Sequence, residues 1–393
     1  MSEYVLRLEH IAKSFFGIAA LKDVNFGLKQ GELLSLIGEN GAGKSTLMNI
    51  VSGVLKQDSG SLYLNGEPYQ PMKPSDATDA GIAFIHQELN LFTNLSILDN
   101  VYINSFRKFP GTPIIKKSAM VSRVKEVLEA VDLKVSPETI VEKLSPGERQ
   151  LVEIAKALSS DPKILIFDEP TTSLTTRETE KLFAIIERLK EEGKSIIYIS
   201  HILADVQKLS DQIIVLRDGQ ITDNDKKENF TIQRMISSMI GREINQLYPN
   251  KTNHPSKEKV LELKDISQSG IVHKINMDVC KGEVVGMFGL MGSGRSELAR
   301  IVYGLDPHES GEIRVHGKEI KGISPQKAIR NKMAFVTENR REEGLFMEFT
   351  IMDNLSLVSV PEKAKTKLKI VNNDSVKEST QGMVGTLKIK CPP

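Results

Sequence analysis

Short, continuous runs of apolar residues alternate in the first part of the chain with longer amphipathic stretches. Three runs of this kind end next to glycine, an acidic residue or serine: Leu33–Ile37, Ile164–Phe167 and Ile196–Ile199. Runs without polar alternation are typical of parallel strands that are buried on both faces. Helices are expected between them, over residues 121–131, 148–159 and 178–192. This alternation predicts a parallel α/β sheet flanked by helices.

A second pattern adds an antiparallel part to this picture. Ser61–Leu64 has the composition of a strand, and Asn65-Gly66 follows it as a turn signal. We therefore expect a mixed sheet arrangement rather than a purely parallel one.

The same pattern of apolar residues and glycines recurs later in the chain. Gly38–Ser45 resembles Gly289–Ser296, which lies 251 positions further on. Shorter matches keep an offset of 251, or of 254 for the last one: Gly31-Glu32 with Gly282-Glu283, Ser59-Gly60 with Ser310-Gly311, Ala83-Phe84 with Ala334-Phe335, and Asp99-Asn100 with Asp353-Asn354. Matches in register over such a length indicate two homologous domains.

A polar stretch with two prolines, 247–257, separates the two copies, as a linker would. We expect a first domain over residues 1–246, a linker over 247–259 and a second domain over 260–393.

The segment Gly38–Ser45 fits the pattern G-x-x-x-x-G-K-[ST], between the apolar run ending at Ile37 and the helical stretch Thr46–Ile50. Glycines let backbone N–H groups approach phosphate oxygens, and the helix N-terminus adds partial positive charge. We expect Lys44 to reach the β- and γ-phosphates and Ser45 to bind Mg²⁺. A glycine-rich turn without a ligand is the alternative, which the strand–loop–helix context disfavours. The candidate nucleotide-binding residues are Gly38, Glu39, Asn40, Gly41, Ala42, Gly43, Lys44, Ser45 and Thr46.

Two acidic residues end the apolar run Ile164–Phe167. Asp168 is the natural partner of Mg²⁺, and Glu169 can polarise the attacking water as general base. Such a pair alone is often a strand end with a solvated acid. Its position after a complete phosphate loop favours the catalytic interpretation.

These motifs resemble the nucleotide-binding domain of ABC transporters. Leu144–Gln150 is similar to the signature Leu-Ser-Gly-Gly-Gln of that family, with Ser145 and Gly147 matching and Pro146 and Glu148 departing. The resemblance implies that this helix start caps the γ-phosphate of an ATP bound by a partner domain. Plain helix capping by Ser145, with Glu148 completing a capping box, is compatible with the same residues.

Three further positions carry over from the family. Gln87 resembles the glutamine that senses Mg²⁺ and the γ-phosphate and contacts the membrane partner, and His201 resembles the histidine that contacts the γ-phosphate. Phe15 resembles the aromatic residue that stacks on adenine. Its neighbour Phe16 competes for this role, and either could belong to the core instead.

The second copy departs from the pattern. Arg295 stands where the first copy has Lys44, and Glu338 stands where it has Gln87. Arginine is not a neutral replacement for a lysine ammonium at a phosphate. These departures resemble the second domain of tandem monosaccharide importers of the ribose, galactose and xylose class. The second signature would fall beyond residue 393, so we expect a partial, C-terminally truncated second copy.

Composition narrows the possible settings. The apolar fraction of 40% and the charged fraction of 26% are typical of a globular protein, and a net charge of +1 gives no reason to expect nucleic acid binding. Cys280 and Cys391 are too few for a disulfide framework or a metal cluster, which favours a reducing compartment. Neither a signal peptide nor an apolar stretch of membrane-spanning length is evident.

The fold expected is thus an α/β P-loop NTPase of the ABC type, with a mixed sheet and a helical subdomain. The expected function is ATP binding and hydrolysis with Mg²⁺ that energises sugar import through partner membrane permease subunits, at the cytoplasmic side of the membrane. A sugar-binding protein would act indirectly, and a homodimer or a complementing ABC domain could complete the ATP site. The alternatives are a non-catalytic nucleotide-binding remnant and a soluble ABC ATPase outside transport.

Overall fold

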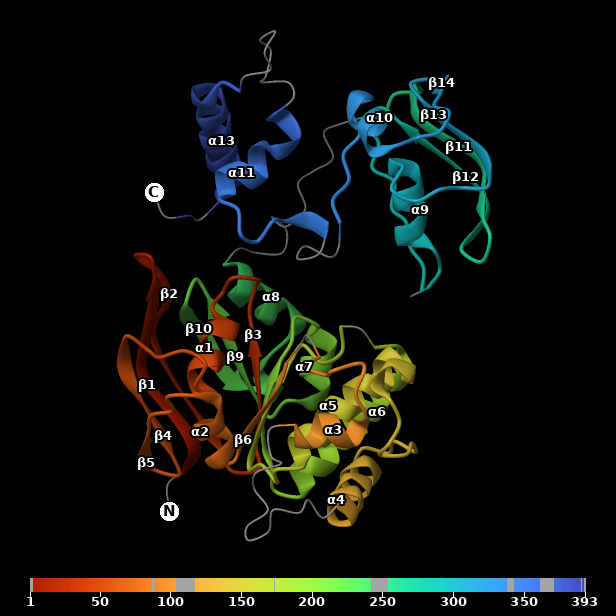
Figure 1. Cartoon of the computed structure of the whole chain (residues 1–393). Coiled ribbons are helices and arrows are strands. Elements are labelled where there is room, and N and C mark those ends of the chain that lie inside the picture. The colour runs from red at the N-terminus through yellow and green to blue at the C-terminus, as the bar shows by residue number, and fades with distance from the viewer. Residues whose placement is uncertain are drawn as a thin grey trace. The chain divides into compact units, whose positions relative to one another are not determined.

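The computed structural model describes residues 3–86, 89–103, 117–172, 174–241, 254–290, 292–337, 343–360, 371–389 and 391. The chain divides into two compact units, unit 1 over Met1–Pro249 and unit 2 over Asn250–Pro393 (Figure 1). None of the helices in these described ranges combines the length and hydropathy needed to cross a membrane.

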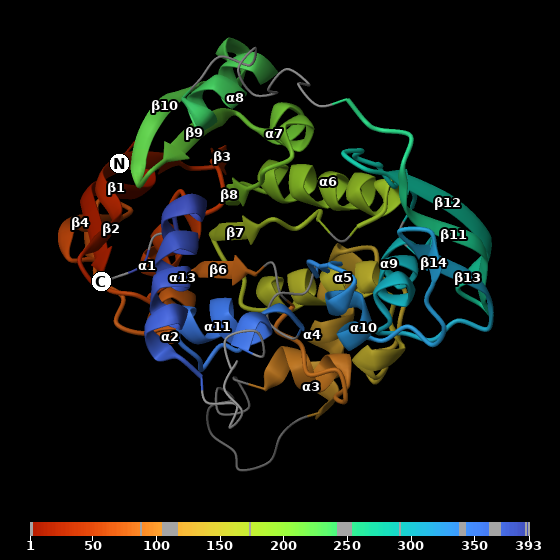
Figure 2. The same cartoon turned by 90° about the horizontal axis from the view of Figure 1, so that it is seen from above.

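Within the described residues of unit 1, six strands form a central sheet in the order β10-β9-β3-β8-β7-β6. Neighbours from β9 to β6 run parallel, and β10 is antiparallel to β9. The strands are β3 (Leu33–Ile37), β6 (Ile82–Ile85), β7 (Ile164–Asp168), β8 (Ser195–Ile199), β9 (Gln212–Arg217) and β10 (Gln220–Lys226). All three predicted strands are confirmed, and Figure 2 shows β8, β7 and β6 side by side.

A second sheet of unit 1 is antiparallel, with the order β2-β1-β4-β5 in its described part. Its strands are β1 (Tyr4–Phe15), β2 (Ile18–Lys29), β4 (Ser59–Leu64) and β5 (Glu67–Tyr69). The turn between β4 and β5 holds Asn65 and Gly66 at φ 53° and 89°, in the left-handed region that Asn and Gly tolerate best. The predicted antiparallel part is confirmed.

The predicted helices are present, but each begins earlier than expected. Helix α5 begins at Pro146 rather than Glu148 because Ser145 is its N-cap, and α6 begins at Thr176 because Thr175 caps it in the same way. The helices of unit 1 are α1 (Lys44–Val51), α2 (Pro74–Asp79), α3 (Ile97–Tyr102), α4 (Lys117–Ala130), α5 (Pro146–Leu158), α6 (Thr176–Glu191), α7 (Leu203–Leu209) and α8 (Ile232–Ile240), with 3-10 turns η1 (Val141–Lys143) and η2 (Lys227–Asn229).

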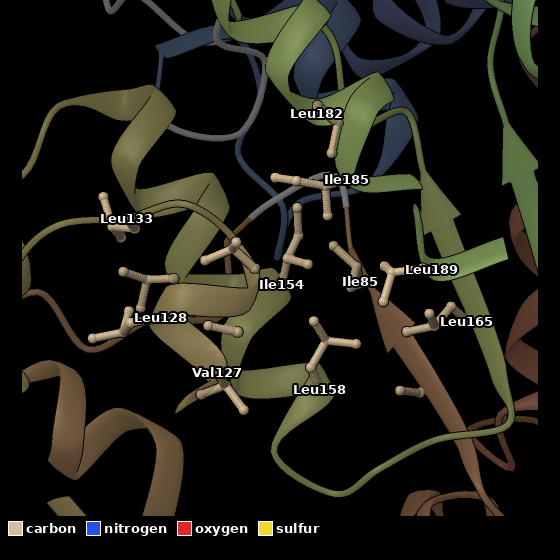
Figure 3. Close-up of a cluster of buried hydrophobic side chains, with 14 of the residues drawn as sticks. Ile85, Val127, Leu128, Leu133, Ile154, Leu158, Leu165, Leu182, Ile185 and Leu189 are labelled. Atoms are coloured by element: carbon tan, nitrogen blue, oxygen red, sulfur yellow. The ribbon is translucent and has the colours of Figure 1, made fainter. Parts of the chain in front are cut away.

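The core of unit 1 lies on both faces of the central sheet. On β7, Leu165 and Phe167 join the cluster formed with α4, α5 and α6, which Figure 3 shows in part. The alternate residues Ile164 and Ile166 join the opposite cluster, with α1 and the antiparallel sheet. Burial of both faces explains the continuous apolar runs. It also fixes α5, which starts at the signature-like segment, against the sheet.

Unit 2 repeats the antiparallel sheet in the order β12-β11-β13-β14, as far as its residues are described. Its backbone conformation also recurs: Gly53 (φ 74°) corresponds to Gly304 (φ 82°), and Asn65 (φ 53°) to His316 (φ 49°), 251 positions apart. The elements are β11 (Lys259–Gln268), β12 (Val272–Cys280), α9 (Arg295–Tyr303), β13 (Ser310–Val315), β14 (Lys318–Glu319), α10 (Pro325–Arg330), α11 (Ile351–Ser356), η5 (Leu357–Ser359) and α13 (Asn373–Leu387).

One turn is built in the same way in both units. In unit 1, the fully buried Asn100 side chain accepts from Phe92 N–H at 2.7 Å and donates to Phe92 O and Ser96 O at 3.0 and 2.9 Å. In unit 2, Asn354 makes the corresponding contacts to Phe346 at 2.9 and 3.0 Å. The repeated Asp-Asn dipeptide therefore marks a shared hydrogen-bonded turn.

Unit 2 differs at the counterpart of β3. The apolar stretch 284–288 forms no strand within the described residues, and Val284 and Phe288 are 91% and 99% exposed. In unit 1, β3 is held between β8 and β9. The described part of unit 2 contains no strand that takes their place.

Candidate nucleotide site

Three candidate segments follow neighbouring strands of the central sheet in unit 1. The sheet places β8 between β3 and β7, and all three run parallel. Their carboxyl ends therefore meet at one edge, which is where ligands bind in such sheets. The phosphate loop follows β3, Asp168 ends β7, and His201 comes two residues after β8.

Lys44 lies at the first position of α1, with its side chain turned into the loop. Its Nζ donates to Gly38 O at 2.7 Å and to Glu39 O at 3.0 Å, and the residue is only 7% exposed. Burial lowers the pKa of Lys44, while the negative charges of Glu169 and Asp168 oppose this shift. A partly buried ammonium beside two carboxyls is well placed to move its hydrogen bonds from loop carbonyls to phosphate oxygens.

The loop has little room for side chains at two of its glycines. Gly43 adopts φ 106°, and a Cβ there would lie 2.7 Å from Ala20 O and 2.8 Å from Leu21 Cδ2. A Cβ on Gly38 would collide with Leu216 O. Close packing against β2 and β9 thus holds the loop in shape. Ala42 is buried and Thr46 half-buried, while the remaining candidates Glu39, Asn40, Gly41 and Ser45 are exposed.

Asp168, the last residue of β7, and Glu169, which follows it, have different environments. Burial and the neighbouring charge of Glu169 raise the pKa of Asp168 to about 6, although Lys44 acts in the opposite direction. Glu169 has a left-handed backbone (φ 48°), and its N–H donates to Ile199 O at 2.9 Å. Its carboxylate Oε2 lies 3.1 Å from His201 Nδ1. The Glu169 side chain is 10% exposed and that of His201 is 51% exposed, so the pair lies at the edge of solvent.

The donor set fits a hard divalent cation completed by phosphate and water. Ser45 supplies a hydroxyl and Asp168 a carboxylate, both oxygen ligands that Mg²⁺ prefers. The raised pKa of Asp168 shows that its negative charge is under-compensated, which a bound cation would relieve. No group of three or more His, Cys, Asp or Glu side chains is arranged to hold a metal in the described ranges. A magnesium ion here would therefore need phosphate oxygens as further ligands.

The aromatic candidate lies at the tip of the β1–β2 hairpin. Phe15 pairs with Ile18 across the hairpin and is 38% exposed, while Phe16 is 87% exposed with φ 50°. The Lys13 ammonium lies 5.7 Å from the Phe15 ring centroid. Both rings are thus too exposed for the core, and Phe15 lies opposite Ile18 at the start of β2, the strand that supports Gly43.

The signature-like segment forms a capped helix start. Ser145 Oγ accepts from Glu148 N–H at 3.3 Å, and Glu148 Oε2 accepts from Ser145 N–H at 2.8 Å, so the predicted capping box is present. Gly147 lies against Glu178, where a Cβ would collide with the carboxyl. Gly147 and Glu148 line an open pocket of about 530 Å³ with the start of α6, and the described lining includes no residue of the phosphate loop. Ser145 and Gly147 thus lie at a separate place from Lys44, Asp168, Glu169 and His201.

Other predicted positions either lie outside the described residues or differ from what the sequence predicted. Gln87 and Glu338 lie outside the described residues. Arg295 begins α9 as Lys44 begins α1, but its side chain is exposed. A residue that sequence reasoning missed is Asp205 on α7, which is 8% exposed and hydrogen-bonded to Thr171 behind the two acids. A single aspartate in a helical stretch gives no local signal that it is buried and hydrogen-bonded next to the site.

A parallel sheet with a glycine-rich strand–loop–helix turn, a buried lysine and an Asp-Glu strand end defines a P-loop nucleotide-binding protein. The chain belongs to the ABC transporter family, which matches residues 21–172 and 272–389.

Similar proteins support this assignment. The chain is 40% identical over 353 residues to a ribose import ATP-binding protein of Bacillus licheniformis, covering 90% of this chain and 71% of that protein. It is 37% identical over 392 residues to a galactose/methyl galactoside import ATP-binding protein of Fusobacterium nucleatum, covering 99% and 78%. A ribose import ATP-binding protein of Bacillus cereus is 36% identical, with 98% and 77% covered.

Solved structures show the same fold. A nucleotide-free ATP-binding cassette from an ABC transporter superposes with a TM-score of 0.54 at 27% identity, covering 63% of this chain and 99% of that one. A bacterial ABC transporter cassette solved as a dimer gives 0.51 at 30% identity, covering 57% and 100%. The fold is therefore that of an ABC nucleotide-binding domain, as predicted.

Proposed function

We propose that this chain is the ATP-hydrolysing subunit of a sugar importer, which binds ATP with Mg²⁺ and energises import of a monosaccharide through partner permease subunits. The observation that carries this proposal is the meeting of Lys44, Asp168, Glu169 and His201 at one edge of the central sheet. The sugar class rests on the names of the relatives, which are ribose and galactose import proteins. We infer action at the cytoplasmic face of the membrane, as a peripheral subunit.

In this proposal the phosphate loop binds and orients the triphosphate. The exposed backbone of residues 39–41 faces solvent, and the first turn of α1 offers unpaired N–H groups and partial positive charge. Lys44 exchanges its bonds to Gly38 O and Glu39 O for phosphate oxygens. Because Lys44 is already partly desolvated, its charge acts strongly on a phosphate that enters the site.

Glu169 is assigned the role of general base, and His201 that of holding it and the γ-phosphate in place. Their separation of 3.1 Å lets His201 Nδ1 orient the Glu169 carboxylate. Mg²⁺, when bound by Ser45 and Asp168 together with phosphate oxygens, would neutralise charge that develops on the phosphates. Phe15 would stack on adenine, and Gln87 would report the state of the γ-phosphate to the membrane partner.

The remaining assignments concern a second nucleotide-binding surface. We propose that Ser145 and Gly147 cap an ATP held by a partner cassette, either a second copy of this chain or a complementing ABC domain. We also propose domains over 1–246 and 260–393 with a linker over 247–259. Exposed Arg295 in place of buried Lys44 supports weak turnover in the second domain.

The test is ATP binding and hydrolysis by the purified chain, followed by transport. We expect Mg²⁺-dependent ATP binding that Lys44→Ala lowers at least ~10-fold, and hydrolysis that Glu169→Gln abolishes while binding remains. Reconstitution with permease subunits of a ribose or galactose importer should then give ATP-dependent uptake of the sugar into vesicles. Binding that does not respond to Lys44→Ala would overturn the nucleotide assignment, and uptake that is independent of ATP would overturn the transport assignment.

A further inference from the structure

A buried polar cluster joins the two loops that carry Glu169 and His201. Thr171 lies two residues after Glu169, and Asp205 lies four residues after His201, in the first turn of α7. Thr171 Oγ1 donates to Asp205 Oδ2 at 2.7 Å, and Tyr198 OH donates to the same oxygen at 3.4 Å. Thr171, Asp205 and Tyr198 are 5%, 8% and 0% exposed.

Burial of these groups makes their hydrogen bonds costly to lose. A buried carboxyl that loses a donor leaves an oxygen unsatisfied, and this destabilises the local structure more than the loss of an exposed contact does. Burial also raises the pKa of Tyr198, so its hydroxyl stays protonated and remains a donor. The hydrogen bonds of this cluster should therefore be stable, next to the more exposed Glu169–His201 pair.

A backbone contact also joins the segments that follow β7 and β8. Glu169 N–H donates to Ile199 O at 2.9 Å, next to the end of β8. Thr172 Oγ1 donates to Glu169 O at 3.0 Å, which ties the segment between Glu169 and Thr171 into a turn. The segments after β7 and β8 are thus joined by the Glu169–Ile199 and Thr171–Asp205 hydrogen bonds, and the same segments carry the contact between Glu169 and His201.

We propose that Asp205 is a positioning residue for ATP hydrolysis, which holds the Glu169 carboxylate and the His201 imidazole in register through its hydrogen bond to Thr171. This inference rests on the proposed function, because it concerns the rate of the hydrolytic step. A shift of about 1 Å between a base and its reaction partner can cost ~100-fold in rate. Loss of the hydrogen bond between Thr171 and Asp205 should therefore lower kcat and leave nucleotide binding by Lys44 nearly intact.

The variants are Asp205→Ala, Thr171→Val and Thr171→Ser in the full chain. We expect Asp205→Ala, which removes the acceptor, and Thr171→Val to lower kcat by ~10-fold to ~100-fold with the Kd for Mg·ATP within about twofold, and Thr171→Ser, which keeps the hydroxyl, to retain most of kcat. Ser210→Ala is the matched control. Ser210 is fully buried directly after α7, where its hydroxyl donates to Val206 O at 2.6 Å and lies 2.5 Å from Ser35 Oγ on β3. Its loss should lower stability with kcat unchanged.

A second readout does not need turnover. Hydrogen exchange of peptides covering residues 168–172 and 199–205 should become faster in Thr171→Val and stay slow in Ser210→Ala, with peptides from β4 unchanged in both. In a His201→Ala background, Asp205→Ala should have little further effect on kcat because both act through the same pair. The proposal is overturned by wild-type kcat in Thr171→Val, by effects additive with His201→Ala, or by unchanged exchange. An inactive wild-type chain would overturn the proposed function instead. The hydrogen-exchange rates would still decide whether the Thr171–Asp205 hydrogen bond holds the two segments together.

Discussion

Asp168 offers a quantitative test of the site, because its environment penalises its charge in the absence of a cation. Burial and the adjacent Glu169 raise its pKa from 3.8 to about 6. The folded state thus binds a proton more tightly at this position than the unfolded state does. We predict that Asp168→Asn stabilises the nucleotide-free, metal-free protein and at the same time removes Mg²⁺-dependent ATP binding.

The sign and size follow from the two pKa values. Because the folded-state pKa is the higher one, stability falls as pH rises from about 4 to about 6 and stays low above that. A shift of about two pKa units corresponds to about 3 kcal/mol at pH 8, and roughly half of this is already present at pH 5. The attraction of Lys44 is included in this net shift. Asparagine has no charge to bury and avoids the penalty at every pH.

The assay is urea unfolding of both proteins in EDTA, between pH 5 and pH 8. We expect Asp168→Asn to be more stable by about 1.5 kcal/mol at pH 5 and by up to about 3 kcal/mol at pH 8. Asp161→Asn is the control, since this carboxylate is 81% exposed and its pKa is lowered by Lys194, so the substitution should not stabilise. A stability difference that does not change with pH, or a less stable Asp168→Asn protein, would refute the reasoning.

Two further predictions concern the loop and the repeated turn. Gly43→Ala should lower stability by about 1–3 kcal/mol and weaken nucleotide binding, because its Cβ would lie 2.7 Å from Ala20 O. Gly41→Ala is the control and should cost less, since a Cβ there would have no neighbouring atom within 4 Å. Equal losses of stability in urea unfolding would contradict this. Asn100→Ala should cost about 1–3 kcal/mol because it removes the buried side chain that pairs Phe92 N–H, Phe92 O and Ser96 O, and a loss under about 0.5 kcal/mol by the same assay would contradict it.

The strands that surround the site were predictable because they are buried on both faces. Ile164–Phe167 contains no polar residue and Ile196–Ile199 only the hydroxyl of Tyr198, and the structure places alternate members of β7 in opposite core clusters. Helix starts were less predictable. The apolar pattern alone places the start of α6 at Glu178, which is the third residue of a helix capped by Thr175, whereas the capping box of Ser145 and Glu148 predicts the start of α5. The capping side chain, not the first apolar residue, decides where these helices begin.

The site itself was only partly predictable. Lys44, Asp168 and Glu169 belong to spaced motifs at strand ends, and the parallel sheet brings such ends together without further information. The role of Asp205 depends on α7 packing behind the loop that contains Thr171, a contact across 34 positions of the chain. Nothing in the neighbouring residues distinguishes this aspartate from a solvated one, so only the fold reveals it.

The two phosphate-loop segments separate what is encoded locally from what needs distant partners. Gly294 precedes α9 at φ 88° much as Gly43 precedes α1 at φ 106°, so the turn into the helix forms in both units. The apolar run before it behaves differently, since Leu33–Ile37 is a fully buried strand while Val284 and Phe288 are almost fully exposed. Unit 1 supplies β8 and β9 on either side, and the described part of unit 2 supplies neither. The basic side chain is buried in unit 1 (Lys44) and exposed in unit 2 (Arg295), although the turn into the helix is present in both. In this chain the basic residue of the phosphate loop is therefore buried in the unit whose preceding strand has neighbours on both sides.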